Sequence, residues 1–222
     1  MKKSLWVKTA SFFVDILLEK QKSEYSGSLE VICRKGRYAL CTDNAVYSYD
    51  DLYHNFRDVF CKIKLNKLDI KNVLVLGLGL GSVPLLLEKT FLKNYTYTLV
   101  EIDPVVVGLA KKYTLSNLQS PLNVVCADAL EFVKSCKQKF DMIAVDIFID
   151  DQVPSVFESV DFLQNVKLLL SPDALLLYNR LAYNESLEHR TQQFFDAEFN
   201  LVFQNAVILP VSGNKMFLNR PL

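Results

Sequence analysis

Residues 73–84, which read VLVLGLGLGSVP, constrain the fold of this chain more than any other stretch. The first four are apolar without alternation, which is typical of a strand buried on both faces of a parallel sheet. Gly77, Gly79 and Gly81 then predict a turn where a Cβ atom would block a ligand or force an unfavourable positive φ. Ser82 is suited to cap a following helix. A strand, a glycine turn and a helix N-terminus together predict a site for a nucleoside or nucleotide.

An acidic residue follows the next expected strand at an informative distance. Residues 95–100 are rich in β-formers and end at Glu101, 20 residues beyond Gly81. A carboxylate at this place is suited to accept two hydrogen bonds from a ribose diol, and the alternative is an ordinary solvated acid at a strand end. The dinucleotide fingerprint requires glycine where Ser82 stands, so the pattern favours an adenosyl ligand over NAD.

Composition excludes several classes of function. Lys and Arg total 25, as do Asp and Glu, so there is no basic footprint for nucleic acid. No apolar run approaches the roughly 18 residues that a membrane span needs. The five cysteines form no Cys-x-x-Cys pair, and His54 and His189 have no partner at metal-ligand spacing. We therefore expect a cytoplasmic protein with reduced thiols, no metal, and neither nucleic acid nor membrane as a partner.

The chain divides into two parts by pattern. We expect residues 1–65 to hold an amphipathic segment, a β-hairpin and a connecting helix, and residues 66–222 to form the adenosyl-binding domain. Asp15 interrupts the apolar run at 10–18, so that run is read as an amphipathic segment and not as a signal peptide. Within the first part, Gly36 marks the turn of the hairpin.

The second part alternates strands with helices. Expected strands lie at 73–76, 97–100, 123–126, 142–145 and 174–178. Expected helices lie at 83–92, 104–114, 128–136 and 155–170. This alternation predicts an α/β fold, a mostly parallel sheet with helices on both faces. Residues 207–209 and 215–218 predict a C-terminal antiparallel hairpin, and Cys126 is expected in the core.

Acids at the carboxyl ends of these strands are the candidate site residues, because open α/β sheets bind ligands there. Asp128 is suited to accept from an adenine amine or to cap the helix that begins at Ala129, and different carboxylate oxygens permit both. Asp146 ends the next strand, where burial near Asp150 and Asp151 would raise a carboxyl pKa, as a general base requires. The alternatives are that Asp146 caps or hydrogen-bonds the following loop, and that Asp150 and Asp151 stay in solvent.

With these residues in view, the chain resembles the spermidine synthase family, which has a class I methyltransferase-like (Rossmann-like) fold. The resemblance runs from about residue 29 to 181 and includes the glycine turn, the strand end at 100–103, Ala127-Asp128-Ala129, and residues 140–146. It implies S-adenosylmethionine, or its decarboxylated form, as the cofactor. Gly77, Gly79, Gly81, Glu101, Asp128 and Ala129 would contact this cofactor.

The resemblance also assigns the acceptor side. Asp146 would take the position of the catalytic base, and Tyr49, from the Ser-Tyr step of the family, and Asp150 would contact the substrate. A small-molecule acceptor, with an amine as one candidate, is implied as the partner. In the resembled family the N-terminal hairpin pairs across a homodimer, which makes a homodimer a possibility here.

Three departures from the family concern the amine. Leu40 stands where the family carries Gln, and Leu80 stands where it carries the Asp that holds the amine of the cofactor. The Asp-Ser-Ser-Asp-Pro loop of the family has become Asp146-Ile-Phe-Ile-Asp150. Because burying an ammonium without acceptors costs several kcal/mol, we expect an acceptor other than the usual diamine.

The leading hypothesis is therefore an adenosyl-cofactor transferase that moves a methyl or an aminopropyl group. A true polyamine aminopropyltransferase, with Asp50, Asp146 and Asp150 in a rearranged site, is the alternative within the enzyme class. A non-catalytic module that binds a nucleoside or a partner is the alternative outside it. An NAD-dependent oxidoreductase comes last, because Ser82 breaks its fingerprint.

Overall fold

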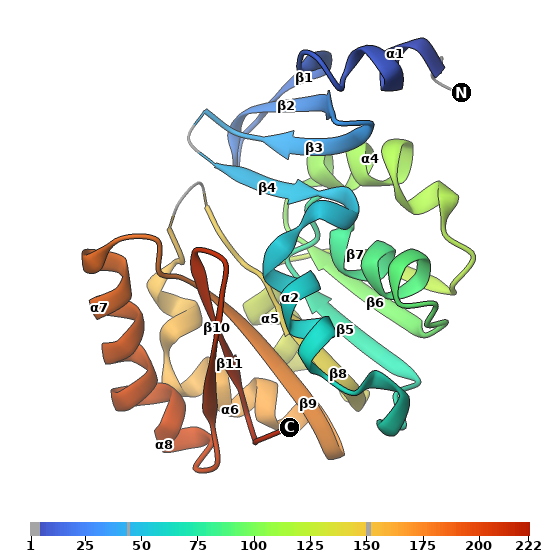
Figure 1. Ribbon diagram of the computed structural model, residues 1–222. Helices are drawn as coiled ribbons and strands as arrows, with labels where there is room; N and C mark the ends of the chain where they lie inside the picture. The colour runs from blue at the N-terminus through green and yellow to red at the C-terminus, as the bar shows by residue number, and fades with distance from the viewer. Residues whose placement is uncertain (1–4, 44, 150–151) are drawn as a thin grey trace.

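A computed structural model describes residues 5–43, 45–149 and 152–222. Its strands form two sheets, a four-stranded antiparallel sheet near the N-terminus and a seven-stranded, mostly parallel sheet (Figure 1). The small sheet lies beside helix α4 (Pro104–Tyr113) at one end of the large one.

The small sheet has the strand order β1-β2-β3-β4. Its strands are β1 (Ile16–Ser23), β2 (Gly27–Arg34), β3 (Arg37–Cys41) and β4 (Val46–Tyr49). The β2–β3 hairpin is confirmed, and both turn residues, Lys35 and Gly36, have positive φ as a type I′ turn requires. Strand β1 was not expected, and the amphipathic reading of its residues is corrected here. It is an edge strand in which Lys20 and Lys22 are exposed and Glu19 is partly buried, so its sequence does not alternate.

The large sheet has the order β10-β11-β9-β8-β5-β6-β7. Its strands are β5 (Asn72–Leu76), β6 (Thr96–Glu101), β7 (Leu122–Cys126), β8 (Phe140–Val145), β9 (Leu170–Leu181), β10 (Val207–Val211) and β11 (Asn214–Leu218). Strands β5 to β9 pair in parallel, while β11 runs antiparallel to β9 and to β10. All five expected parallel strands and the C-terminal hairpin are confirmed. Strand order reverses at β5, which has β6 on one side and β8 on the other.

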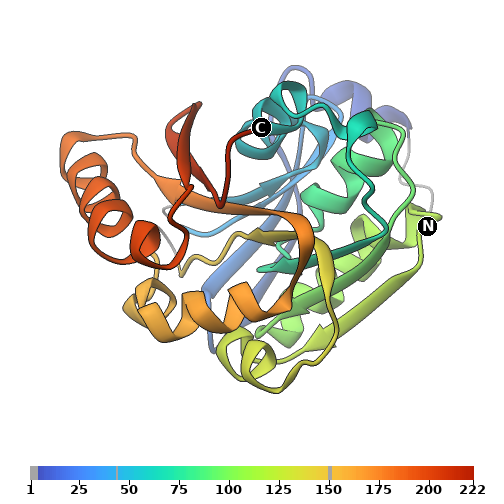
Figure 2. The ribbon, with the colours of Figure 1, turned by 90° about the horizontal axis from the view of Figure 1, so that it is seen from below.

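Helices cover both faces of the large sheet (Figure 2). The α-helices are α1 (Leu5–Ala10), α2 (His54–Lys62), α3 (Ser82–Leu85), α4, α5 (Ala129–Ser135), α6 (Val160–Leu169), α7 (Glu185–Phe194) and α8 (Asn200–Val202). The 3₁₀ turns are η1 (Asp50–Leu52), η2 (Leu65–Lys67), η4 (Leu115–Asn117) and η5 (Ser155–Glu158), and η3 (Leu86–Thr90) and η6 (Phe195–Phe199) are π-helical. Buried side chains of α2, α3 and α4 pack on one face, and those of α5, α6 and α7 pack on the other.

Two further expectations meet the structure here. Cys126 is exposed, so its assignment to the core was wrong; it ends β7, which lies at the edge of the sheet. The boundary at residue 65 stays a prediction, although Phe56, Val59 and Phe60 of α2 are buried in the core of the large sheet. None of the helices in the described ranges is long and apolar enough to span a membrane.

Candidate functional site

A cavity of about 480 Å³ opens at the carboxyl ends of β5, β6, β7 and β8. This is where the strand order reverses, the place at which open α/β sheets bind ligands. Of the expected site residues, the cavity is lined by Gly77, Gly79, Glu101, Asp128, Ala129 and Asp146. Gly81 and Tyr49 do not line it. Asp150 lies outside the described residues.

Position 77 requires glycine because the backbone of Asp146 approaches it closely and its φ is positive. It has φ +89°, and a Cβ at this position would lie 2.7 Å from the carbonyl carbon of Asp146 and closer still to its oxygen. Gly79, with φ +52°, similarly accepts the close approach of β4, since an added Cβ would lie 3.0 Å from Ser48 Cβ. The absence of side chains therefore brings Asp146 and the small sheet against the turn. Ser82 does not cap α3: Gly81 is the N-cap, and Ser82 Oγ accepts from Tyr49 N.

The backbone amides of the turn are all engaged inside the protein. Those of Gly77 and Gly81 donate to the carbonyl oxygens of Val100 and Leu78. Those of Leu78 and Gly79 donate to the carboxylate of Glu101, and that of Leu80 donates to Ser48 Oγ. A phosphate-binding turn needs free amides that point at its ligand. The amides of this turn are therefore not free to bind a phosphate.

Glu101 ends β6 with its carboxylate in the cavity. Its Oε2 accepts from Leu78 N at 3.0 Å and its Oε1 from Asp103 N at 3.1 Å. Burial raises the pKa of Glu101, and these backbone hydrogen bonds oppose the rise. Because a carboxylate has about four acceptor sites, it retains capacity toward a ligand diol.

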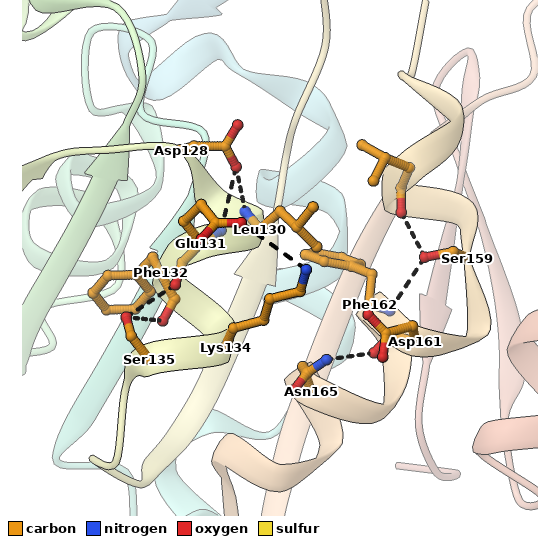
Figure 3. A network of polar contacts seen from close by, with 11 residues as sticks. Asp128, Leu130, Glu131, Phe132, Lys134, Ser135, Ser159, Asp161, Phe162 and Asn165 are labelled. Atoms are coloured by element: carbon orange, nitrogen blue, oxygen red, sulfur yellow. Dashed lines mark hydrogen bonds and ion pairs between the residues drawn. The ribbon is translucent and has the colours of Figure 1, made fainter.

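Asp128 caps α5, as one of its two readings required. Its Oδ1 accepts from Leu130 N at 2.6 Å and from Glu131 N at 3.4 Å. Figure 3 shows the other carboxylate oxygen pointing away from the helix. Since Asp128 also lines the cavity, capping the helix leaves one oxygen for a ligand.

Asp146, directly after β8, is the centre of a buried polar chain. Its Oδ1 accepts from Tyr53 Oη at 3.1 Å and from Asn179 Nδ2 at 2.8 Å. Asn179 Oδ1 in turn accepts from Asn214 Nδ2 at 2.8 Å. Burial raises the pKa of Asp146 to about 6, while the hydrogen bonds from Asn179 and Tyr53 act in the opposite direction. The pKa lies in the range of a general base that works near neutrality.

Sequence analysis missed Tyr53, Asn179 and Asn214. The signal available for Asn179 was an amide directly after the apolar expected strand at 174–178. A buried amide requires partners, which marks such a residue for attention. No comparable signal distinguished Tyr53 from a core aromatic residue or Asn214 from a turn residue.

One wall of the cavity beyond Asp146 is apolar, although Tyr53, Asn55 and Asn214 also line the cavity. This wall comes from the segment that follows β8, and consists of Ile147, Phe148, Ile149, Pro154, Val156 and Phe157. Tyr178, which ends the expected strand at 174–178, does not line the cavity and is buried in the core. Among the described lining residues, the charged groups are three carboxylates, and no Lys, Arg or His is present. The same part of the chain holds no cluster of three potential metal ligands.

Both leucines that depart from the family pattern lie outside the cavity. Leu40 and Leu80 are buried in one apolar cluster under the small sheet, together with residues of α4. Asp50 is not at the cavity either, and its Oδ2 accepts from Tyr38 N. A site rearranged around Asp50 is therefore not assembled.

Comparison with known proteins places these features in a family. The family profile of the spermine/spermidine synthase domain matches residues 59–215. The chain belongs to the spermine/spermidine synthase family. A polyamine aminopropyltransferase of Vibrio vulnificus is 30% identical over 152 residues, 67% of this chain and 50% of that protein. An eEF1A lysine and N-terminal methyltransferase homolog of Drosophila melanogaster is 32% identical over 53% of this chain and 19% of that protein. This family member spans half the length of the Vibrio relative and less of the Drosophila one.

Solved structures agree on the fold. A probable spermidine synthase from Corynebacterium glutamicum superposes with a TM-score of 0.72 at 16% identity, covering 90% of this chain and 78% of that one. Human methyltransferase-like protein 13, solved in complex with SAH, gives 0.56 at 22% identity, with 78% of each chain covered. The class I methyltransferase-like fold expected from the sequence is thus confirmed.

Proposed function

We propose that this protein is a transferase that uses S-adenosylmethionine or its decarboxylated form. The charge of the cavity carries the proposal: its described lining presents three carboxylates and no cationic side chain. An adenosyl sulfonium is a cation that this lining would attract, whereas a nucleotide phosphate would be repelled. The engaged amides of the glycine turn also disfavour a phosphate. NAD is disfavoured for both reasons.

Glu101 and Asp128 would hold the nucleoside. Glu101, at the end of β6, has acceptor capacity left for the ribose hydroxyls. The second oxygen of Asp128 would accept from the adenine amine, with Ala129 beside it in the lining. A bound adenosyl sulfonium would supply a carbon whose bond to sulfur breaks as the acceptor attacks, leaving a neutral thioether. Methyl and aminopropyl transfer differ only in which carbon is attacked.

Asp146 would receive the proton of the attacking nitrogen or oxygen. Its Oδ2 accepts no hydrogen bond from the described residues, whereas Oδ1 accepts two. With a pKa of about 6, the carboxyl is ionised at neutral pH and able to take this proton.

We further propose that the acceptor carries one nucleophilic group on an apolar body. Asp146 is the charged group of the described lining on this side, where it is joined by an apolar wall and by the neutral side chains of Tyr53, Asn55 and Asn214. A diamine would need an acceptor for its second ammonium, since desolvating an unpaired charge costs several kcal/mol. A role for Asp150 at the second amine stays a prediction. A true polyamine aminopropyltransferase is therefore the second candidate, favoured by the Vibrio relative.

Calorimetry with S-adenosylmethionine, its decarboxylated form, S-adenosylhomocysteine and NAD tests the cofactor. We expect binding of adenosyl sulfonium compounds, at least tenfold weaker binding in Glu101→Ala, and no binding of NAD. Tight binding of NAD, or unchanged binding in Glu101→Ala, would overturn the assignment.

Mass spectrometry of reaction mixtures then tests the acceptor, with Asp146→Asn as the inactive control. Putrescine is compared with butylamine, which has the same chain and one amine. Transfer to butylamine but not putrescine supports the single-nucleophile acceptor, and the reverse supports the aminopropyltransferase. Cofactor binding without transfer to any amine, alcohol or peptide would favour a non-catalytic module.

The homodimer and the cytoplasmic location also stay predictions.

A further inference from the structure

The amides of Asn179 and Asn214 form a line that ends at Asp146. Asn179 is 1% exposed on β9, and Asn214 is 8% exposed at the first position of β11. The two strands are antiparallel neighbours, so the C-terminal hairpin carries Asn214 to a residue about 35 positions earlier in the chain. Buried amides of this kind are costly unless every group is paired.

The chemistry of the partners fixes which way each amide faces. An ionised carboxylate only accepts hydrogen bonds, so Asn179 must present its Nδ2 to Asp146, at 2.8 Å. This leaves Asn179 Oδ1 facing the other way, where it needs a donor. Asn214 Nδ2 supplies that donor at 2.8 Å. The Asn214 amide thus supplies the donor that Asn179 needs in the one orientation that stabilises an ionised Asp146.

We propose that Asn214, acting through Asn179, is a positioning residue that keeps Asp146 ionised and leaves its Oδ2 turned toward the acceptor. Asn179 and Tyr53 both donate to Oδ1, so the opposite oxygen is the one available for a substrate proton. The catalytic part of this statement depends on the proposed function, whereas the control of the ionisation of Asp146 does not.

The surroundings of Asp146 contain few groups that could act in place of these amides. Tyr53 is the titratable group in contact, and burial raises its pKa well above the ordinary value, so its hydroxyl stays a donor. Strands β5, β9 and β11 present Gly77, Asn179 and Asn214, none of which titrates. Glu101 and Asp128 line the same cavity from the ends of β6 and β7.

The deciding variant is Asn214→Asp, which keeps the shape of the side chain but replaces the donor with an acceptor. Once the new carboxyl group ionises, it only accepts hydrogen bonds, so Asn179 turns its Nδ2 toward position 214 and its Oδ1 faces Asp146. Two oxygens in contact require a proton between them, so Asp146 becomes protonated. Carbon-13 NMR of the carboxyl groups should show the pKa of Asp146 higher by at least one pH unit than in the wild type. No substrate or cofactor is needed for this measurement.

A second readout separates this reorientation from simple repulsion by the new charge. In the wild type, the side-chain amide protons of Asn179 should titrate together with Asp146. In Asn214→Asp they should instead follow the new carboxyl group. An unchanged Asp146 pKa, or Asn179 amide protons that still follow Asp146, would refute the proposal.

Two further variants complete the test. Should Asn214→Asp fail to fold, Asn179→Leu removes the amide altogether and should also raise the pKa of Asp146, which a purely structural role would leave unchanged. Asn165→Asp on α6 is the matched control, because Asn165 donates locally to Asp161 O, and it should leave Asp146 unaffected. Calorimetry of S-adenosylmethionine binding on the same samples reports separately on the proposed function.

Discussion

Replacing Asp146 with Asn should stabilise the protein while abolishing transfer. Burial raises the pKa of Asp146 from the ordinary 3.8 to about 6. The ionised carboxylate therefore destabilises the native state by about 3 kcal/mol, from about 1.4 kcal/mol for each pH unit by which the pKa is raised. The cost is small near pH 4, where the acid is protonated in the native state and only about half ionised in the unfolded state. It develops as pH rises toward 6 and is complete above that value.

The Asn side chain has nearly the same shape and stays neutral at every pH. Its Oδ1 can accept from Tyr53 and Asn179 as the carboxylate does. The free energy of unfolding of Asp146→Asn should thus exceed that of the wild type by little at pH 4 and by about 3 kcal/mol at pH 8. The variant should also lose the proton acceptor of the proposed reaction, an exchange of activity for stability.

Urea unfolding of both proteins between pH 4 and pH 8 measures this difference. Asp69→Asn is a suitable control, because Asp69 pairs with Lys71 on the surface and the pair should contribute under about 1 kcal/mol. A difference between Asp146→Asn and wild type that stays constant with pH would refute the reasoning. So would an Asn variant that is less stable than wild type at pH 8.

Three further substitutions test the site. Gly77→Ala should destabilise the protein by at least about 2 kcal/mol in urea unfolding, because a Cβ collides with the Asp146 backbone at a φ of +89°. Glu101→Gln should weaken S-adenosylmethionine binding less than Glu101→Ala in calorimetry, since the amide oxygen still accepts from Leu78 N. Asp103→Ala should both destabilise the protein, by about 1–3 kcal/mol, and weaken that binding. Asp103 accepts from Ser23 and Ser26 in the β1–β2 turn, and Ser26 lines the cavity; unchanged affinity would show that the turn is irrelevant to the ligand.

Local patterns were enough to predict the α/β core. The apolar run of β5 must be buried on both faces. Because such runs alternate with helices along the chain, a parallel sheet with helices on both faces is the expected arrangement. Chain order then places Glu101, Asp128 and Asp146 at one edge of this sheet, since parallel strands end on the same side. The candidate carboxylates could therefore be named from the sequence.

Long-range contacts decided the rest. Asn179 and Asn214 meet only because β11 runs back along β9, and Tyr53 reaches Asp146 from the segment before α2. Tyr49 was assigned to the site from a motif, yet its hydroxyl donates to Arg34 O within the small sheet. Sequence periodicity reports which face of an element is buried, and it carries no information on the partner across the interface. The identity of the acids and the fold were thus readable from the chain itself, whereas the hydrogen bonds that set the ionisation of Asp146 exist only in the tertiary structure.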